Sequence, residues 1–339
     1  MASSRPTLRR LAAEAGVSPM TVSLALRNSP EVSAATRRKL QLLAARRGYR
    51  PDPTITKLMH HLRSQRLTRF KASICVLKQS LAEAIMYPDN YLVRLERGLR
   101  ERAEALGYGV TAIDIEDHPS PGQLQRVLVS RGIEGLVLLP LRRSRDLTDW
   151  LDWRVFATVS ATSSVLAPQF HGVQPHHFEN MLRACAELKR SGLRRIGLAL
   201  TQEWDKRVHH CWSAGLAWQN LFGGTTPVVP FIDAQAGPNI TSTTFRRWIE
   251  RERPDVILCE TYDRGAFSVM LKALPARRRP MIATLNWPNP PASAGIDQRP
   301  ERIGAVAVEV LAGMLTRGEK GIPAQPNTTM IDGSWVIGR

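Results

Sequence analysis

The basic residues of this chain are concentrated at its start. Residues 1–71 contain 15 Lys and Arg against three acidic residues, whereas the rest of the chain contains 32 against 27. Most of the net charge of +17 therefore falls in the first fifth of the 339 residues. Cationic side chains gathered on one segment of a nearly balanced protein are typical of binding to nucleic-acid phosphates. A basic disordered tail would have the same composition, so the choice depends on whether this segment can fold.

No residue set has the spacing of a catalytic or metal site. The chain lacks a Gly-rich phosphate loop, a Gly-x-Ser-x-Gly elbow and a His-Glu-x-x-His motif, which argues against an enzyme. The cysteines show no metal-ligand spacing, and we expect reduced, mostly buried thiols. These are Cys75, Cys185, Cys211 and Cys259. Five histidines lie between residues 171 and 210, where surface or cleft lining is the more common role. We therefore expect no metal and no cofactor.

Composition and apolar segments indicate a soluble protein of two or three domains. Hydrophobic residues make up 43% and charged residues 23%, as in ordinary globular proteins. The longest apolar runs, such as residues 135–141, are far short of the ~20 residues that cross a bilayer. The first residues, MASSRPTLRRLAAEAG, have no apolar stretch of the kind found in signal peptides. We expect a cytoplasmic, nucleoid-associated protein.

Three sets of helix signals lie within the basic segment. Thr7 can cap a first helix that Gly16 ends. Ser18, followed by Pro19 at the first helical position, begins a second helix, and Ser33 can cap a third. Two short helices joined by a tight Gly-Val-Ser turn and braced by a third form a helix-turn-helix arrangement. The sequence therefore predicts a folded all-α segment instead of a tail.

The same segment contains the motif LxxLAxxAGVSxxTVSxxL, followed by VSxxTRxxL and GYxP. It resembles the headpiece of the lactose-repressor (LacI/GalR-type) family of transcription regulators, almost without a gap from Thr7 to Pro51. The resemblance implies a DNA-binding headpiece over residues 1–52, a hinge helix and linker over 53–71, and an effector-binding and dimerisation core over 72–339. It also implies that a homodimer binds double-stranded operator DNA of pseudo-palindromic sequence.

By this resemblance, the second helix lies in the major groove with its first residues facing base edges. Pro19, Met20 and Leu24 occupy the positions that read bases, and Leu8 and Arg9 lie nearby. Better-known members have polar or cationic side chains at these positions. Apolar side chains can contact thymine methyl groups, so we expect recognition to depend on T-rich steps and DNA shape. Packing of Met20 and Leu24 in the headpiece core is the alternative.

A second group of headpiece side chains is expected to hold phosphates. Hydroxyl, amide and guanidinium groups donate to phosphate oxygens and fix the register of a protein on the duplex without reading its sequence. By resemblance, these side chains are Ser18, Thr21, Ser23, Asn28, Ser33, Thr36 and Arg37. They predict DNA binding but do not predict the operator sequence.

The segment 53–71 contains a further helix signal. Asp52 can cap it, with Pro53 at the first helical position and apolar residues along one face. In this family such a segment pairs with its twin in the minor groove and inserts a leucine between the central base pairs. Leu58 matches that leucine, and Ile55 stands where a small alanine is usual. An ordinary amphipathic linker helix is the alternative.

From residue 72 onward, short apolar runs alternate with amphipathic helices. The expected strands cover residues 72–77, 109–115, 135–140, 156–160, 195–200, 256–259 and 280–285. The expected helices include residues 91–106 and 178–191. Repeated strand–helix units imply parallel sheets with helices on both faces.

The resemblance continues through LERGLRERAEALGYGV, GIEGLVLLP, RRIGLAL and IDQRPERIGAVAVEVL. It implies an α/β core like that of periplasmic sugar-binding proteins, with two doubly wound parallel-sheet subdomains around a small-molecule cleft. The N-subdomain is expected at about 72–165 and 298–323, and the C-subdomain at about 166–297 and 324–339. Three crossovers of the chain would join them.

The residues that usually anchor a sugar in this family are altered here. Many members have an arginine three residues before the glycine of an Ala-Gly pair, whereas this chain has Trp212 before Gly215. A tryptophan face packs well on the C–H face of a sugar ring, so we expect a carbohydrate effector held by aromatic and polar side chains. The expected set is Tyr87, Tyr91, Asp205, Arg207, His210, Trp212, Asn286 and Trp287. For each tryptophan, core or interface packing is the alternative.

Effector binding is expected to change the angle between the subdomains and the pairing of the hinge segments, and so the affinity for the operator. We expect a repressor that acts as a homodimer, since no heptad tail follows Arg339. A regulator with a non-sugar or lost effector is the alternative that the missing arginine leaves open. A sugar-binding transport protein would share the core but would have no use for residues 1–71.

Overall fold

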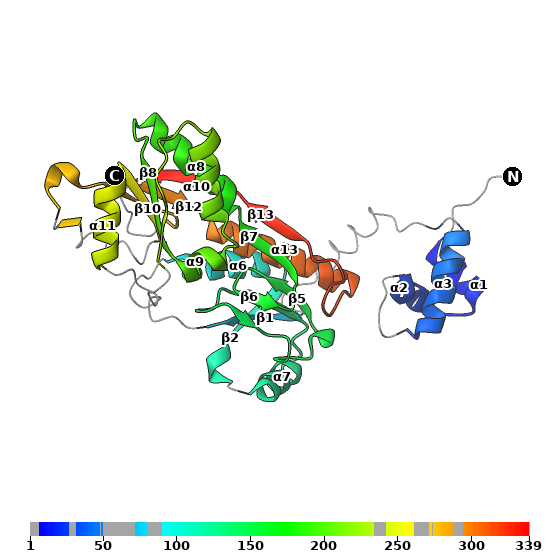
Figure 1. Ribbon diagram of the computed structural model, residues 1–339. Helices are drawn as coiled ribbons and strands as arrows, with labels where there is room; N and C mark the ends of the chain where they lie inside the picture. Colours follow the sequence, from blue (N-terminus) through cyan, green and yellow to red (C-terminus); the bar gives the residue numbers. More distant parts are fainter. Residues whose placement is uncertain are drawn as a thin grey trace.

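The computed structural model describes residues 7–26, 32–47, 49, 72–79, 90–118, 120–233, 242–260, 271–272, 274–287 and 294–338. These residues form a small all-α headpiece and an α/β core with two six-stranded sheets (Figure 1). The predicted fold class is therefore confirmed. Several expected site residues lie outside the described residues: Asn28, Ile55, Leu58 and Tyr87. The side chains of Arg9, Met20 and Ser23 are also not described.

The headpiece consists of α1 (Leu8–Ala15), α2 (Pro19–Leu26) and α3 (Ala34–Arg46). Each begins at the residue that the sequence predicts. The hydroxyl of Thr7 accepts a hydrogen bond from the Arg10 amide at 3.3 Å, and the Ser18 hydroxyl accepts one from the Thr21 amide at 3.0 Å. Gly16 ends α1 in the left-handed conformation, with φ of +67°, which a residue without a Cβ adopts at little cost.

A small apolar core holds the three helices together. Its buried members are Leu11, Ala12, Val22, Ala25, Val32, Leu40 and Ala44. Two polar contacts add to it. The side-chain amide of Gln41 donates to the Ala25 carbonyl at 3.1 Å, and Arg47 forms an ion pair with Glu14, with 3.0 Å between Nε and Oε1. These contacts tie α3 to α2 and the residue that follows α3 to α1.

The first sheet of the core has the strand order β13-β7-β5-β3-β1-β2, and all neighbouring strands are parallel. Its strands are β1 (Ala72–Lys78), β2 (Tyr108–Asp114), β3 (Gly135–Leu138), β5 (Ala157–Ser160), β7 (His171–Pro175) and β13 (Thr328–Ile331). Alternate residues of β1 enter two different cores. Ile74 and Val76 pack with α6 (Tyr91–Ala105) and α13 (Pro300–Arg317), whereas Cys75 and Leu77 pack with α7 (Pro121–Ser130). Helices therefore cover both faces of the sheet.

The second sheet has the order β14-β12-β11-β10-β8-β9 and is parallel except that β14 pairs antiparallel with β12. Its strands are β8 (Ile196–Thr201), β9 (Phe231–Asp233), β10 (Val256–Cys259), β11 (Met281–Thr284), β12 (Ala294–Asp297) and β14 (Ser334–Ile337). One face packs on α8 (His177–Arg190) and α10 (Cys211–Phe222), and the other packs on α11 (Ser242–Glu252). The short α9 (Gln202–Arg207) follows β8 directly. A separate two-stranded sheet joins β4 (Arg145–Asp146) and β6 (Val165–Ala167).

The strand pairing moves two of the expected subdomain boundaries. Residues 166–175 and 324–331 were expected in the C-subdomain, but β7 and β13 pair with each other and β7 pairs with β5 in the first sheet. The N-subdomain therefore extends to residues 175 and 331. The run His171–Pro175 contains a single β-branched residue, so its composition gives little sign of an interior strand. The chain crosses between the sheets after β7, after β12 and after β13.

The three crossovers lie against one another. The buried side chain of Asn180, in the first turn of α8, accepts a hydrogen bond from the Gly333 amide at 2.8 Å. A Cβ added to Gly333 would lie 2.7 Å from the carbonyl oxygen of Asp297, at the end of β12. Glycine is therefore needed at this position for the second and third crossovers to approach so closely.

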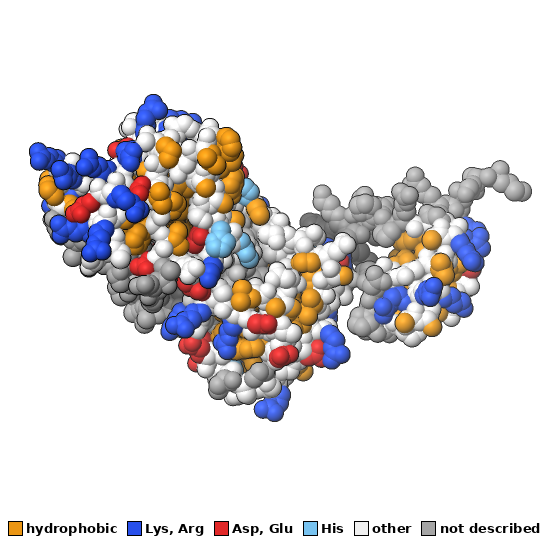
Figure 2. All heavy atoms as spheres, in the orientation of Figure 1, with side chains coloured by type: hydrophobic (Ala, Val, Ile, Leu, Met, Phe, Trp, Pro, Cys, Tyr) orange, Lys and Arg blue, Asp and Glu red, His pale blue; other side chains and the backbone are white. Residues whose placement is uncertain are grey.

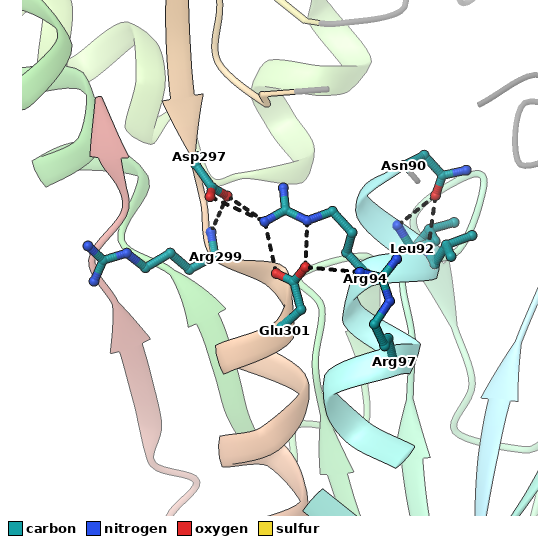
Figure 3. A network of polar contacts seen from close by, with 8 residues as sticks. Asn90, Leu92, Arg94, Arg97, Asp297, Arg299 and Glu301 are labelled. Atoms are coloured by element: carbon teal, nitrogen blue, oxygen red, sulfur yellow. Dashed lines mark hydrogen bonds and ion pairs between the residues drawn. The ribbon is translucent and has the colours of Figure 1, made fainter. Parts of the chain in front are cut away.

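Arg94 joins the end of β12 to two helices of the N-subdomain (Figure 3). From α6, its guanidinium donates to Glu301 of α13 at 2.7 Å and to Asp297 at 3.1 Å. Burial opposes the charge of Arg94, but its hydrogen bonds with these two carboxylates outweigh that effect and raise its pKa. Asp297 also accepts the Arg299 amide at 2.9 Å. The network fixes the second crossover against the N-subdomain.

Candidate DNA-binding and effector sites

Three of the expected DNA-contacting residues lie together at the start of α2. Ser18 and Pro19 are exposed and Thr21 is half-buried. The hydroxyls of Ser18 and Thr21 are 2.9 Å apart, so the cap also holds both side chains at the exposed end of the helix. Helix N-termini present backbone N–H groups to anions. The geometry therefore offers phosphate oxygens both hydroxyls and amides at one place.

Two of the expected base-contacting residues have a partly structural position. Leu8 and Leu24 are half-buried and pack against the headpiece core, which agrees in part with the core-packing alternative for Leu24.

At the start of α3, the Ser33 hydroxyl donates to the Thr36 hydroxyl at 2.8 Å. Arg37 donates to the Val32 carbonyl at 3.0 Å. The expected phosphate-contacting residues of α3 thus form its N-terminal cap, and Ser33 is exposed.

The surface of the headpiece is electropositive. Its exposed cations are Arg10, Arg38, Lys39, Arg46 and Arg47, and Figure 2 shows blue side chains spread over this part of the molecule. Glu14, the acidic residue among those described in the headpiece, is paired with Arg47. Because Arg47 neutralises Glu14, this carboxylate does not offset the positive charge of the other cations.

In the core, polar side chains gather where the parallel strands of the second sheet end. Ligands of open α/β sheets bind at this edge. Thr201 ends β8, and the buried Asp205 follows within α9. One oxygen of Asp205 accepts from His210 Nδ1 at 2.7 Å and from the Ser213 hydroxyl at 3.0 Å. Its other oxygen, Oδ1, is inaccessible to solvent and has no hydrogen-bond partner among the described residues.

Trp212 does not present an open face for stacking. It is 1% exposed and packs in the core of the C-subdomain, with its ring 4.8 Å from that of His177. Its indole N–H and the Nδ1 of His177 are nevertheless buried without a hydrogen-bond partner among the described residues. Buried polar atoms usually have a partner, so this pair of rings carries unused hydrogen-bonding capacity.

The other expected effector residues lie at different parts of the same sheet edge. The guanidinium of Arg207 stacks on Trp204 at 4.5 Å and donates to the carbonyl of Arg142, in the loop that follows β3 of the N-subdomain. Asn286 and Trp287 follow β11 and are half-buried. The Trp287 amide donates to the Ile296 carbonyl at 2.7 Å. Among the expected effector residues that the structure describes, Arg207 thus contacts both subdomains directly.

Among the described residues, no group of three or more His, Cys, Asp or Glu side chains is arranged to hold a metal ion. No helix formed by the described residues has both the length and the apolar character that a membrane span requires.

Residues 7–52 match the family model described as bacterial regulatory proteins, lacI family. The headpiece belongs to the lacI family. The predicted resemblance is thereby confirmed where it is most specific, at the motif that runs through α1, α2 and the caps of α2 and α3. The lacI-family headpiece also explains why the positive charge lies at the start of the chain.

Solved structures extend the likeness to the core as a likeness of fold. A transcriptional regulator CelR–cellobiose complex is 17% identical over 98% of this chain and 99% of that chain, with a TM-score of 0.57. A lac repressor dimer bound to operator and the anti-inducer ONPF is 18% identical over 98% of both chains, with a TM-score of 0.53. A LacI-family regulatory protein from Chloroflexus aggregans is 16% identical over 78% and 96%, with a TM-score of 0.57. A comparison with curated protein sequences gives no match.

Two residues near the sheet edge were not in the predicted effector set. Glu260 is buried directly after β10. Burial, together with the nearby carboxylate of Glu260, raises the pKa of Tyr91, the first residue of α6 in the N-subdomain. His177 is the second residue that was not in the predicted effector set. An acidic residue that directly follows a buried apolar strand was a usable signal for Glu260, whereas the contact of His177 with Trp212 depends on how α8 packs on α10.

His177 should make the protein less stable in mild acid. Burial, with the neighbouring His176 and His209, lowers the pKa of His177 from 6.5 to about 3. The unfolded chain therefore binds the extra proton first, and stability present above pH 6.5 is lost as the pH falls toward 3. The limit is about 1.4 kcal/mol per pH unit. Urea unfolding at pH 7 and pH 5.5 should show a larger loss for the wild type than for His177→Gln, and equal losses would contradict this.

Proposed function

We propose that the protein is a transcription regulator that binds a pseudo-palindromic operator as a homodimer and responds to a small-molecule effector. The observation that carries the proposal is the folded, electropositive lacI-family headpiece, with Ser18, Pro19 and Thr21 at the exposed start of α2. A lac repressor dimer bound to operator is among the structures that share the fold, which supports the DNA-bound dimer.

In this proposal α2 enters the major groove and its first residues face the bases. Pro19 and Met20 offer no bidentate hydrogen bonds, so base discrimination rests on contact with thymine methyl groups and on DNA shape. Phosphates are held by the caps of α2 and α3. Two headpieces, one from each protomer, occupy half-sites about one helical turn apart.

The effector is proposed to bind at the ends of the parallel strands, between the two subdomains. Asp205 Oδ1, whose hydrogen-bonding capacity is unused, and the half-buried side chain of Asn286 would bond the hydroxyl groups of a ligand there. A CelR–cellobiose complex shares the fold, which supports a carbohydrate. Closure on the ligand would pivot at the three crossovers and change the contact of Arg207 with the loop after β3. In this way a bound effector would alter the spacing of the two headpieces.

Selection of duplexes from a random pool by the purified full-length protein tests the DNA-binding part. The proposal expects enriched sequences with two inverted half-sites and two chains bound per duplex. Enrichment of a single asymmetric site, with one chain per duplex, would contradict the homodimer.

Asp205 gives a prediction for the effector part. Asp205→Asn keeps the shape of the side chain but removes the negative charge that accepts hydrogen bonds from His210 and Ser213. Affinity for the carbohydrate that stabilises the wild type most should fall by roughly 10–100-fold, as for loss of a charged hydrogen bond. Calorimetric titration would measure it, with the exposed Asp149→Asn as the matched control. Unchanged affinity would remove Asp205 from the site, and no response to any carbohydrate would favour a non-sugar or lost effector.

A further inference from the structure

Helix α10 has an apolar face that points away from the core of the C-subdomain. Its inner face packs Trp212, Gly215, Leu216 and Gln219. Its outer face follows the spacing i, i+3, i+4, i+7 and i+8, which places five side chains along one side of a helix. We call these residues the α10 face: Ala214, Ala217, Trp218, Leu221 and Phe222. Trp218 is 43% exposed, Leu221 75% and Phe222 72%.

Among the described helices of the C-subdomain, α10 is the one without a charged residue. None of the twelve residues of α10 is Lys, Arg, Asp or Glu, although its outer side is open. The neighbouring α8 carries Glu187, Lys189 and Arg190 near its end, and α11 carries several charged residues on its exposed side. In Figure 2, orange side chains gather over the region that α10 occupies. A helix that is apolar on both sides is normally covered on both sides.

Within the α10 face, the aromatic rings are already arranged as a unit. Trp218 and Phe222 are one turn apart, with ring centroids separated by 5.9 Å. Aromatic side chains are enriched in the centres of protein interfaces, and Ala214 and Ala217 at the other end of the face allow close approach of another helix.

We propose that the α10 face is an interface between two copies of this chain. Residues 72–339, which include α10, carry 32 basic against 27 acidic residues, so two cores repel one another, and an uncharged face is where that repulsion is weakest. A two-fold contact places the same patch of each copy against the other, so any charge on the patch would meet a like charge. Nucleic acid or an acidic protein would instead need cations on the face, and α10 has none.

The size of the α10 face predicts a weak association. The open parts of its five side chains amount to roughly 400–500 Å² per copy. Two copies would bury about 900 Å² in total, below the ~1,200–2,000 Å² of a stable interface. The contact therefore forms at raised protein concentration, or adds to a pairing made elsewhere. It goes beyond the proposed function, which requires paired headpieces but does not assign this surface.

Sedimentation equilibrium of the full-length chain across a micromolar concentration range tests the proposal. Leu221→Glu places a charge at the most exposed point of the α10 face, where it does not enter the core. Val129→Glu is the control, because Val129 is 56% exposed on α7 of the other subdomain. The limiting mass of the Leu221→Glu protein should be half that of the wild type and of the control. Equal masses for all three proteins across the range would overturn the proposal.

Mixing gives a second readout that separates a self-contact from a change in folding. Leu221→Glu and Leu221→Lys proteins should each stay at the lower mass when alone, whereas their mixture should recover the larger species, since opposite charges then meet. Recovery in the mixture supports a contact between copies, and its absence despite association of the wild type would assign the effect to another surface. Binding to a single operator should persist in both variants, so failure of this proposal and failure of the proposed function remain distinguishable.

Discussion

Val22→Asp is expected to abolish operator binding while leaving the unfolding of the α/β core (residues 72–339) unchanged. Val22 is fully buried among the three helices of the headpiece. An unpaired carboxylate there costs several kcal/mol, and a core of this size supplies no more than about 3–5 kcal/mol. The headpiece would therefore be mostly unfolded, and operator affinity should fall at least ~100-fold. Anisotropy with labelled operator measures the affinity, and calorimetry follows the core.

Leu42→Asp is the matched control for this experiment. Leu42 lies on α3 and is 54% exposed, so the same change of charge occurs in the same domain without entering its core. A small loss of affinity from the added negative charge is expected for this variant. If Val22→Asp bound operator as well as Leu42→Asp, the folded headpiece would not be the element that binds DNA.

Gly304→Ala is expected to destabilise the α/β core by roughly 1–3 kcal/mol or more, the cost of forcing an extra methyl group against fixed backbone. In the contact between α13 and α6, a Cβ at Gly304 would lie 2.2 Å from the carbonyl oxygen of Leu95 and 2.8 Å from the amide nitrogen of Leu99. Gly98, on the opposite helix, meets the backbone of Glu301 equally closely. Since both obstacles are backbone atoms, the helices must move apart. Denaturant unfolding would measure the loss.

Gly313→Ala, on the same helix, provides the comparison. The atom closest to a Cβ there is the end of the flexible Arg317 side chain, at 3.0 Å, so little has to move. Alanine is also favoured over glycine within a helix by up to about 1 kcal/mol. Gly313→Ala should therefore be neutral or slightly stabilising. Equal effects at the two positions would show that the α6–α13 contact is looser than the structure indicates.

Local signals were sufficient to predict the headpiece. Thr7, Gly16, Ser18 and Ser33 act through neighbours three or four residues away, so their capping roles can be recognised in the sequence alone. The expected strands of the core were also recognisable, since parallel strands buried on both faces are short apolar runs. The short strands β7 and β13 were missed, and with them the boundary between the subdomains. That boundary depends on which strand pairs with which, and the pairing is a property of the whole sheet.

The effector region was harder to predict for a related reason. Asp205 and His210 are five residues apart and contact each other across a turn, so their proximity follows from the local sequence. Trp212 was expected to offer a stacking face, but its ring packs in the core because α8 brings His177 against it. Glu260 and Tyr91 are distant in sequence and come from different subdomains. Their proximity depends on the crossovers, which have no sequence signature of their own.

The measurement that tests the central claim most directly is the salt dependence of binding to a selected duplex and to a scrambled one. Binding of the full-length protein to the selected duplex should be far tighter, by roughly 10³-fold or more. For both duplexes, the logarithm of affinity should fall linearly with that of salt concentration, because headpiece cations displace counterions from phosphates. A regulator that recognises an operator requires both results. Equal, weakly salt-dependent binding to the two duplexes would contradict the account.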